Sequence, residues 1–128
     1  MKLRQRILVG MLALGVATPA SAAADARRGE QVYKRCLACH ALAYDRVGPR
    51  HCGLFGRRAA SVFGFGYSAA MRHSKIVWNA RTLDQFLTDP KKMVPGTTMT
   101  YDGVRDRTER ADLIAYLKQA GQSAECRR

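Results

Sequence analysis

Apolar side chains recur at the three- and four-residue spacing of an amphipathic helix near both ends of the chain. The first such segment begins at Asp25, which we predict to be its N-terminal cap, and leads into residues 36–40. The second begins at Asp106, which forms with Glu109 the pattern of a capping box, and ends at Gly121. Its apolar face comprises Leu113, Ile114, Tyr116 and Leu117. The pattern therefore predicts a helix close to each terminus.

Two shorter helices are predicted between these. One spans residues 68–73 with Ser68 as its cap, and the other begins at Asn79 or Thr82 and ends before Pro90. Pro90 and Pro95 then predict a non-helical passage that closes in a Pro95-Gly96 turn. No segment shows the two-residue alternation that indicates a strand.

Residues 48–67 follow neither periodicity and are interrupted by glycines, so we predict loops there. Apolar and aromatic side chains within these loops are Leu54, Phe55, Phe63, Phe65 and Tyr67. Loops with so much apolar area need a partner that covers it. A bound cofactor is one explanation, and ordinary packing of the loops is the other.

The chain has 128 residues, which is enough for one domain. Residues 1–22 have the three parts of a secretory signal peptide: a basic start, an apolar run over 7–17, and the small residues Ala20 and Ala22 before a cleavage site. The apolar run is too short for a permanent membrane-spanning helix. We therefore predict a signal peptide at 1–22 and a single domain at 23–128 in the periplasm, with an uncleaved anchor as the alternative.

The formal net charge is +12, and it falls to +9 when the three basic residues of the signal peptide are removed. The remaining basic residues are scattered, and no arginine-rich block interleaved with aromatics indicates a nucleic-acid surface. An exported cationic protein is better interpreted as one that docks transiently on acidic partners or anionic membrane surfaces, since such charge acts chiefly on the rate of encounter.

Candidate chemistry lies at Cys36-Leu37-Ala38-Cys39-His40, which matches the C-x-x-C-H signature of covalent c-type haem attachment. In that chemistry the two thiols add across the haem vinyl groups, and the imidazole binds the iron. The alternatives are a thioredoxin-like redox pair and half of a zinc site.

Cys52 and Cys126 remain as an even pair once Cys36 and Cys39 are assigned to haem. In an oxidising compartment such a pair predicts a disulfide. This bond would pin the C-terminus to the loop that follows the haem motif. The alternative is two unrelated thiols.

A haem iron bound by His40 also needs an account of its sixth ligand position. We favour Met99, because the Pro95-Gly96 turn just before it can hold a thioether at a set position without regular structure. A lone methionine is more often core filler than a ligand. The downstream candidates are Met71, Met93, Met99, His51 and His73.

From one terminal helix to the other, the chain resembles the class I cytochromes c, most closely the bacterial cytochrome c2 and cytochrome c-550 group. The resemblance runs in order along the chain. It rests on Gly29, Tyr33, Cys36, Cys39, His40, Gly48-Pro49, 53–57, 64–68, Trp78, Leu87, Pro90, 94–99 and 110–118.

The resemblance implies an all-α cytochrome c fold, in which N- and C-terminal helices cross at Gly29 and Tyr116 while short helices and loops wrap around one covalently bound haem c. It implies that Cys36 and Cys39 carry the haem. It also implies that His40 and Met99 are the axial iron ligands, a pair that leaves no open iron position.

Further haem contacts are implied by the same resemblance. The carbonyl of Pro49 would accept the imidazole N–H of His40, which fixes the tautomer of the ligand. Tyr67 and Trp78 would donate hydrogen bonds to a buried haem propionate, with Arg57 offsetting its charge and Thr97 near that edge. The plainer interpretations are core aromatics for Tyr67 and Trp78, a solvated loop charge for Arg57 and a turn former for Pro49.

Three positions depart from the family. Met71 stands where many relatives carry an asparagine, and Phe86 stands where many carry a tyrosine that donates toward the ligand sulfur. Tyr101 takes a place usually held by phenylalanine. The first two changes remove polar groups near the haem, so we predict a drier distal side with an altered reduction potential and altered pH-dependent ligand exchange.

The function implied is that of a soluble, monomeric periplasmic electron carrier that cycles its iron between Fe(II) and Fe(III) and is not an enzyme. Its partners would be acidic-surfaced redox proteins: a bc1 complex, a terminal oxidase, a photosynthetic reaction centre, or a periplasmic dehydrogenase such as methanol dehydrogenase. Neither nucleic acid nor stable membrane insertion is expected. The alternative is a haem peroxidase or ligand-binding haem protein, which would require that Met99 is labile or not a ligand; the sequence offers no evident distal His and Arg pair for it. Candidate docking residues are Lys34, Arg35, Arg46, Arg50, Lys91, Lys92 and Arg105.

Overall fold

The computed structural model describes residue 15 and residues 22–128. The predicted signal peptide therefore lies, apart from its residues 15 and 22, outside the described part of the chain. Within the described residues, no helix is both long and apolar enough to cross a membrane.

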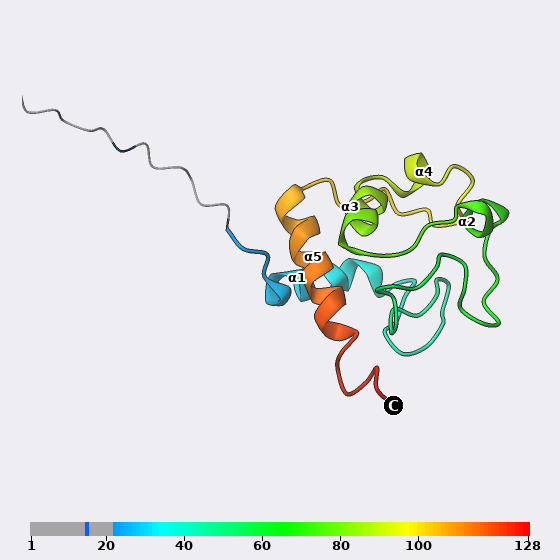
Figure 1. The fold of residues 1–128 in the computed structure, drawn as a ribbon, viewed down its shortest axis with the longest axis horizontal. Helices are drawn as coiled ribbons and strands as arrows, with labels where there is room; N and C mark the ends of the chain where they lie inside the picture. The colour runs from blue at the N-terminus through cyan, green and yellow to red at the C-terminus, as the bar shows by residue number, and fades with distance from the viewer. Residues whose placement is uncertain (1–14, 16–21) are drawn as a thin grey trace, which may run out of the picture.

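The described chain is helical, as predicted. Its helices are α1 (Ala26–Tyr33), a 3-10 helix (Lys34–Cys36), α2 (Ala69–His73), α3 (Ala80–Thr88), α4 (Pro90–Met93) and α5 (Arg107–Ala120). Figure 1 shows α1 and α5 crossing at one end of the domain, with α2 at the other end and the long loops between them. The described residues form no strand; one isolated antiparallel bridge pairs Arg58 with Val77.

Helix α1 begins where the sequence predicts, because the carboxylate of Asp25 accepts the N–H groups of Arg27 (2.8 Å) and Arg28 (3.3 Å). The α-helix ends at Tyr33, and the chain tightens into a 3-10 turn over Lys34–Cys36. The N–H groups of Cys39 (3.1 Å) and His40 (2.9 Å) both reach the carbonyl of Cys36. The chain therefore stays coiled as far as the imidazole, although no longer as an α-helix.

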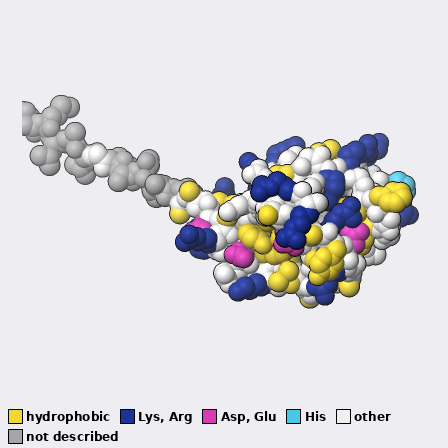
Figure 2. Space-filling view, turned by 90° about the horizontal axis from the view of Figure 1, so that it is seen from below, with side chains coloured by type: hydrophobic (Ala, Val, Ile, Leu, Met, Phe, Trp, Pro, Cys, Tyr) yellow, Lys and Arg dark blue, Asp and Glu magenta, His cyan; other side chains and the backbone are white. Residues whose placement is uncertain are grey.

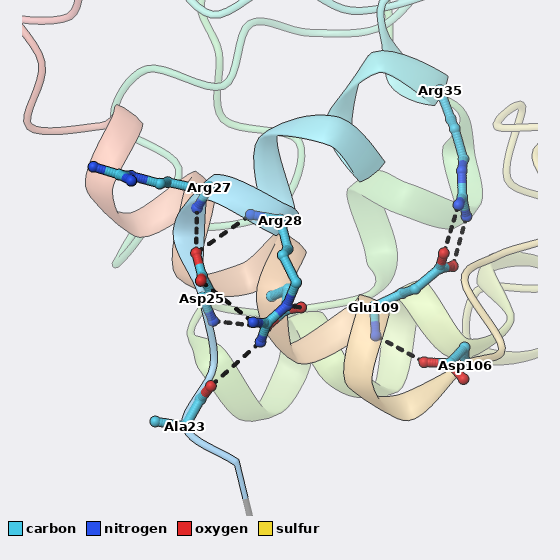
Figure 3. A network of polar contacts seen from close by, with 8 residues as sticks. Ala23, Asp25, Arg27, Arg28, Arg35, Asp106 and Glu109 are labelled. Atoms are coloured by element: carbon cyan, nitrogen blue, oxygen red, sulfur yellow. Dashed lines mark hydrogen bonds and ion pairs between the residues drawn. The ribbon is translucent and has the colours of Figure 1, made fainter.

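The crossing of α1 and α5 occurs at Gly29, as predicted. A Cβ atom there would lie 1.9 Å from the carbonyl oxygen of Asp112 and 2.8 Å from Cβ of Tyr116, so only glycine lets the backbones approach this closely. Beside the crossing, the buried carboxylate of Asp112 accepts the N–H of Asp25 (2.6 Å) and Nε of Arg28 (2.7 Å). Figure 3 shows Asp25 and Arg28, two members of this polar network.

Helix α5 is capped by Asp106, which accepts the N–H of Glu109 at 2.8 Å. The predicted capping box is only half formed. The Glu109 carboxylate turns instead to Arg35, with oxygen–nitrogen distances of 2.6 and 2.7 Å (Figure 3). Gly121 does end the helix, but at φ −60, so the left-handed conformation that favours glycine is not the reason.

The prediction of a non-helical passage from Pro90 to Pro95 is wrong in its first half. Residues Pro90–Met93 form the single helical turn α4. Proline at the first helical position loses no hydrogen bond, and Asp89 caps the turn by accepting the N–H of Lys92 at 3.1 Å. The start of α3 is settled at Asn79, which forms a full capping box with Thr82.

The loops over 48–67 contain no helix or strand, as predicted. Leu54 and Val62 are buried, whereas Phe63 at the loop tip is 96% exposed. The buried core joins both terminal helices to α3, to Leu54 and to Trp78.

Candidate functional site

A cavity of about 530 Å³ lies between the terminal helices, α3 and the loops. Its size falls in the range of sites for small molecules and cofactors. Leu54, Phe65 and Tyr67 line it, which explains much of the apolar loop area noted in the sequence. The structure also brings together along its wall every residue for which a haem contact is predicted: Cys36, Cys39, His40, Pro49, Arg57, Tyr67, Trp78, Thr97 and Met99.

The two thiols of the C-x-x-C-H motif are free, with Cys36 half-buried and Cys39 exposed. Burial raises the pKa of Cys36 to about 11, and the neighbouring Cys39 adds to the shift while Arg35 opposes it. A thioredoxin-like pair needs the opposite, a thiol whose pKa is lowered. In the described residues no group of three or more His, Cys, Asp or Glu side chains could hold a metal ion, which disfavours the zinc alternative as well.

His40 is buried and its Nδ1 lies 2.8 Å from the carbonyl oxygen of Pro49. Because a carbonyl can only accept, Nδ1 carries the proton and Nε2 keeps its lone pair for a metal. Burial lowers the pKa of His40, against the opposing effect of the Pro49 bond, so the ring stays in the neutral form that binds metals. A Cβ at position 48 would lie 2.2 Å from Cε1 of His40, so Gly48 is required for more than the turn.

The sequence did not indicate the position that His51 takes in the structure. It is a sequence candidate for the sixth ligand, but its ring stacks on that of His40, with centroids 4.3 Å apart and an interplanar angle of 22°. It therefore sits beside the proximal imidazole rather than across the cavity from it. Its Nδ1 lies 2.9 Å from the hydroxyl of Tyr33. Burial holds the pKa of His51 well below its ordinary value, with His40 and Arg57 adding to the shift.

The other candidates for the sixth ligand differ in whether they line the cavity. Met71 and Met99 line the cavity, whereas Met93 and His73 are not part of its wall. The turn before Met99 forms as predicted, with Gly96 at φ +92 and the N–H of Thr97 bonded to the carbonyl of Val94 at 3.0 Å. The Thr97 hydroxyl accepts the N–H of Met99 at 3.2 Å, which ties this residue to its loop.

The residues predicted to surround a propionate also have contacts within the protein. The Tyr67 hydroxyl accepts the N–H of Val62 at 3.3 Å, and the buried Trp78 ring lies 5.0 Å from that of Phe86. The Arg57 guanidinium donates to the carbonyls of Arg50 (2.9 Å) and Cys52 (3.1 Å). Burial lowers the pKa of Arg57.

Away from the cavity wall, the sulfurs of Cys52 and Cys126 lie 1.94 Å apart, which is bonding distance. The link joins residues 74 positions apart in the chain. It fastens the tail after α5 to the residue next to His51.

Comparison with known proteins identifies the architecture. The family model described as Cytochrome c matches residues 26–121, from the start of α1 to the end of α5. The chain belongs to the cytochrome c family. It is 42% identical to cytochrome c2 of Blastochloris viridis over 118 residues, which cover 90% of this chain and 93% of that protein.

Cytochrome c2 of Rhodomicrobium vannielii is 45% identical over 107 residues, which cover 80% of this chain and 86% of that protein. Among solved structures, cytochrome cH from Methylobacterium extorquens superposes with a TM-score of 0.72 at 41% identity. The match covers 74% of this chain and 98% of that one. The resemblance to class I c-type cytochromes and the predicted cytochrome c fold are thereby confirmed.

Family membership means that the cofactor is covalently bound haem c with its iron, and that the chain is an electron-transfer cytochrome. The residues present fit this group. The cavity offers two free thiols, an imidazole whose Nε2 is available, and a wall built largely from apolar side chains.

Proposed function

We propose that this cytochrome c is a soluble periplasmic electron carrier whose haem is attached through Cys36 and Cys39 and whose iron is bound by His40 and Met99. The observation that carries the ligand pair is the bond from Nδ1 of His40 to Pro49, which leaves Nε2 free beside a cavity that Met99 also lines. When bound, haem supplies a reversible one-electron change at its iron.

The protein residues serve this function by keeping the two iron ligands in fixed positions. The carbonyl of Pro49 fixes the tautomer of His40, and the Thr97 hydroxyl ties the backbone of Met99. Phe86 and Leu113 contribute to an apolar wall that excludes water. With His40 and Met99 both bound, the iron would have no position left for a substrate, so we expect electron transfer without transformation of a substrate.

Tyr67, Trp78, Arg57 and Thr97 are proposed to surround the haem propionates, because all four line the cavity and carry hydrogen-bond donors. A propionate buried without such partners would be costly. The guanidinium of Arg57 already bonds two carbonyls, so it acts on a propionate chiefly through its charge.

The proposed location is the periplasm, after cleavage that leaves a chain from about residue 23. The support is the basic, apolar and small-residue pattern of residues 1–22 together with the pair Cys52 and Cys126, whose bond requires an oxidising compartment. N-terminal sequencing of the protein from its host locates the cleavage site. A chain that retains Met1 contradicts this part of the proposal.

The partners are proposed to be acidic-surfaced redox proteins. Lys and Arg side chains are spread over the face in Figure 2, with hydrophobic side chains between them and fewer acidic ones. Such a surface accelerates encounter with an acidic patch, and salt weakens the effect. Electron transfer to a native partner should therefore slow as ionic strength rises from low to physiological values. Rates indifferent to salt contradict the docking proposal.

The ligand pair is tested by the visible and near-infrared spectrum. The ferric protein should be low-spin and show the weak near-infrared band of a bond from methionine sulfur to iron. Met99→Ala should lose this band and become high-spin, while Met93→Ala, which alters a methionine outside the cavity wall, should keep it. A high-spin wild-type spectrum would favour a haem peroxidase or ligand-binding protein instead.

A further inference from the structure

We propose that His51 is a positioning residue that fixes the orientation of the His40 imidazole toward the iron. This inference rests on the proposed function in one respect, the binding of iron by His40. The observation behind it is a stacked pair of imidazoles on the proximal side, only one of which can be a ligand.

The His40 ring needs such a neighbour. The torsion that turns an imidazole about its bond to Cβ has broad energy wells, so the side chain alone does not hold the plane of the ring. The Pro49 carbonyl restrains Nδ1, and Gly48 lies so close to the ring that a Cβ there would be 2.2 Å from Cε1 of His40. The flat ring of His51, 22° from parallel at 4.3 Å, restricts rotation of the plane itself.

His51 can act in this way because it is itself held. Its backbone N–H lies 3.1 Å from the carbonyls of both Ala41 and Leu42, the two residues that follow the proximal ligand. Its Nδ1 shares a hydrogen bond of 2.9 Å with Tyr33, a core residue of α1 that is 3% exposed. The ring of Tyr33 in turn lies 5.0 Å from that of Tyr116 in α5.

Two further restraints act on the chain directly beside His51. The Arg57 guanidinium donates to the carbonyls of Arg50 and Cys52, one on each side of His51. Cys52 is also joined to Cys126 at the C-terminal end of the chain. Side chain, backbone and covalent link therefore all fix the place of one imidazole.

If His51 only filled space, a histidine would not be needed at this position. Burying a polar ring is costly unless its nitrogen is bonded, and an apolar side chain of similar volume would fill the same space without that cost. What an aliphatic side chain lacks is a rigid flat face. A flat side chain at position 51 should therefore hold the His40 ring in place, whereas an aliphatic side chain of similar volume should not.

The test compares two double variants, Tyr33→Phe/His51→Phe and Tyr33→Phe/His51→Leu. Both remove the hydrogen bond without leaving a buried hydroxyl unpaired, but only the first keeps a flat ring against His40. The readout is the proton NMR spectrum of the ferric holoprotein, in which the order of the haem methyl resonances depends on the orientation of the axial ligand planes. The phenylalanine variant should keep the wild-type order, and the leucine variant should lose it.

The proposal is overturned if the leucine variant keeps the wild-type order, or if both variants change it alike. Tyr33→Phe alone serves as the stacked control if the phenylalanine double variant does not accumulate as holoprotein, since it retains the His51 ring. The proposed function has its own readout in the same samples. A wild-type ferrous protein without a ring-current-shifted methionine methyl resonance contradicts ligation by Met99, whatever the variants at position 51 show.

Discussion

Among the glycines that the structure describes, Gly29 leaves the least room for an added Cβ, so its replacement by alanine gives a sharp test of the fold. The added Cβ would lie 1.9 Å from the carbonyl oxygen of Asp112, whereas ordinary contact begins at 3.4 Å. The carbonyl belongs to the middle of α5 and cannot rotate away as a flexible side chain could. The two helices would therefore have to separate locally by about 1.5 Å.

Two effects of opposite sign set the size of the change. Alanine favours the helix over glycine by about 1 kcal/mol. Overpacking of a tight contact typically costs 1–3 kcal/mol, and a clash with fixed backbone lies toward the upper end at about 3 kcal/mol. The net expectation is a loss of about 2 kcal/mol, which corresponds to a fall in Tm of about 8–16 °C for a domain of this size.

Thermal unfolding of the holoprotein, followed by far-UV circular dichroism, measures this loss. The matched control is Gly66→Ala, because Gly66 is exposed, has no described atom within 4 Å of its added Cβ, and does not have a positive φ. The control should be neutral or slightly stabilising. If Gly29→Ala melts at or above the wild-type temperature, the close crossing of α1 and α5 is not a constraint on the fold.

Three further changes have expected outcomes. Phe86→Tyr places a hydroxyl at a buried position on the cavity wall, so it should shift the midpoint potential and lower stability by about 1–3 kcal/mol if the hydroxyl finds no partner; an unchanged potential in a redox titration would contradict the idea of a dry distal side. The bonds from Arg28 and the Asp25 N–H hold the pKa of Asp112 below its ordinary value. The stabilisation from its carboxylate is therefore complete above the unfolded-state pKa, about 4, and is lost as the pH falls toward the lower folded-state value. The gap in urea midpoint between wild type and Asp112→Asn should narrow between about pH 6 and about pH 3, and a constant gap would refute this linkage. Cys52→Ala/Cys126→Ala opens a loop of 74 residues and should cost about 4 kcal/mol in urea unfolding, whereas an unchanged midpoint would mean that the two thiols are not bonded.

The helix starts were accessible from the sequence because capping is local chemistry. Asp25, Ser68 and Asp106 each cap a helix as predicted, since each side-chain oxygen reaches an N–H only two or three residues ahead. The same local reasoning failed at Pro90. Proline ends a helix when it follows several turns, but here Asp89 caps a new turn in which proline is the first residue.

Part of the site was predictable, because the motifs follow one another along the chain in the order typical of the family. The C-x-x-C-H motif and the turn before Met99 lie far apart in the chain, and only the family pattern linked them before the structure placed both on one cavity. The sequence made His51 a candidate for the sixth iron ligand. A histidine shortly after the motif carries no local sign of whether it will lie beside His40 or across the cavity from it. Its place depends on Tyr33, Arg57 and Cys126, which no local pattern connects to it.

The contact between the first and last helices also has a consequence for biosynthesis. The bond from Asp25 to Asp112 spans 87 residues, so α1 acquires its packing partner only when nearly the whole chain has been made. Contacts this distant in sequence require a large loop to close before they contribute to stability. The early cysteines consequently lie in an open polypeptide until residues as late as Asp112 are available to pack. In an exported chain, packing of the C-terminal helix against α1 is therefore the step that closes the fold around the cavity.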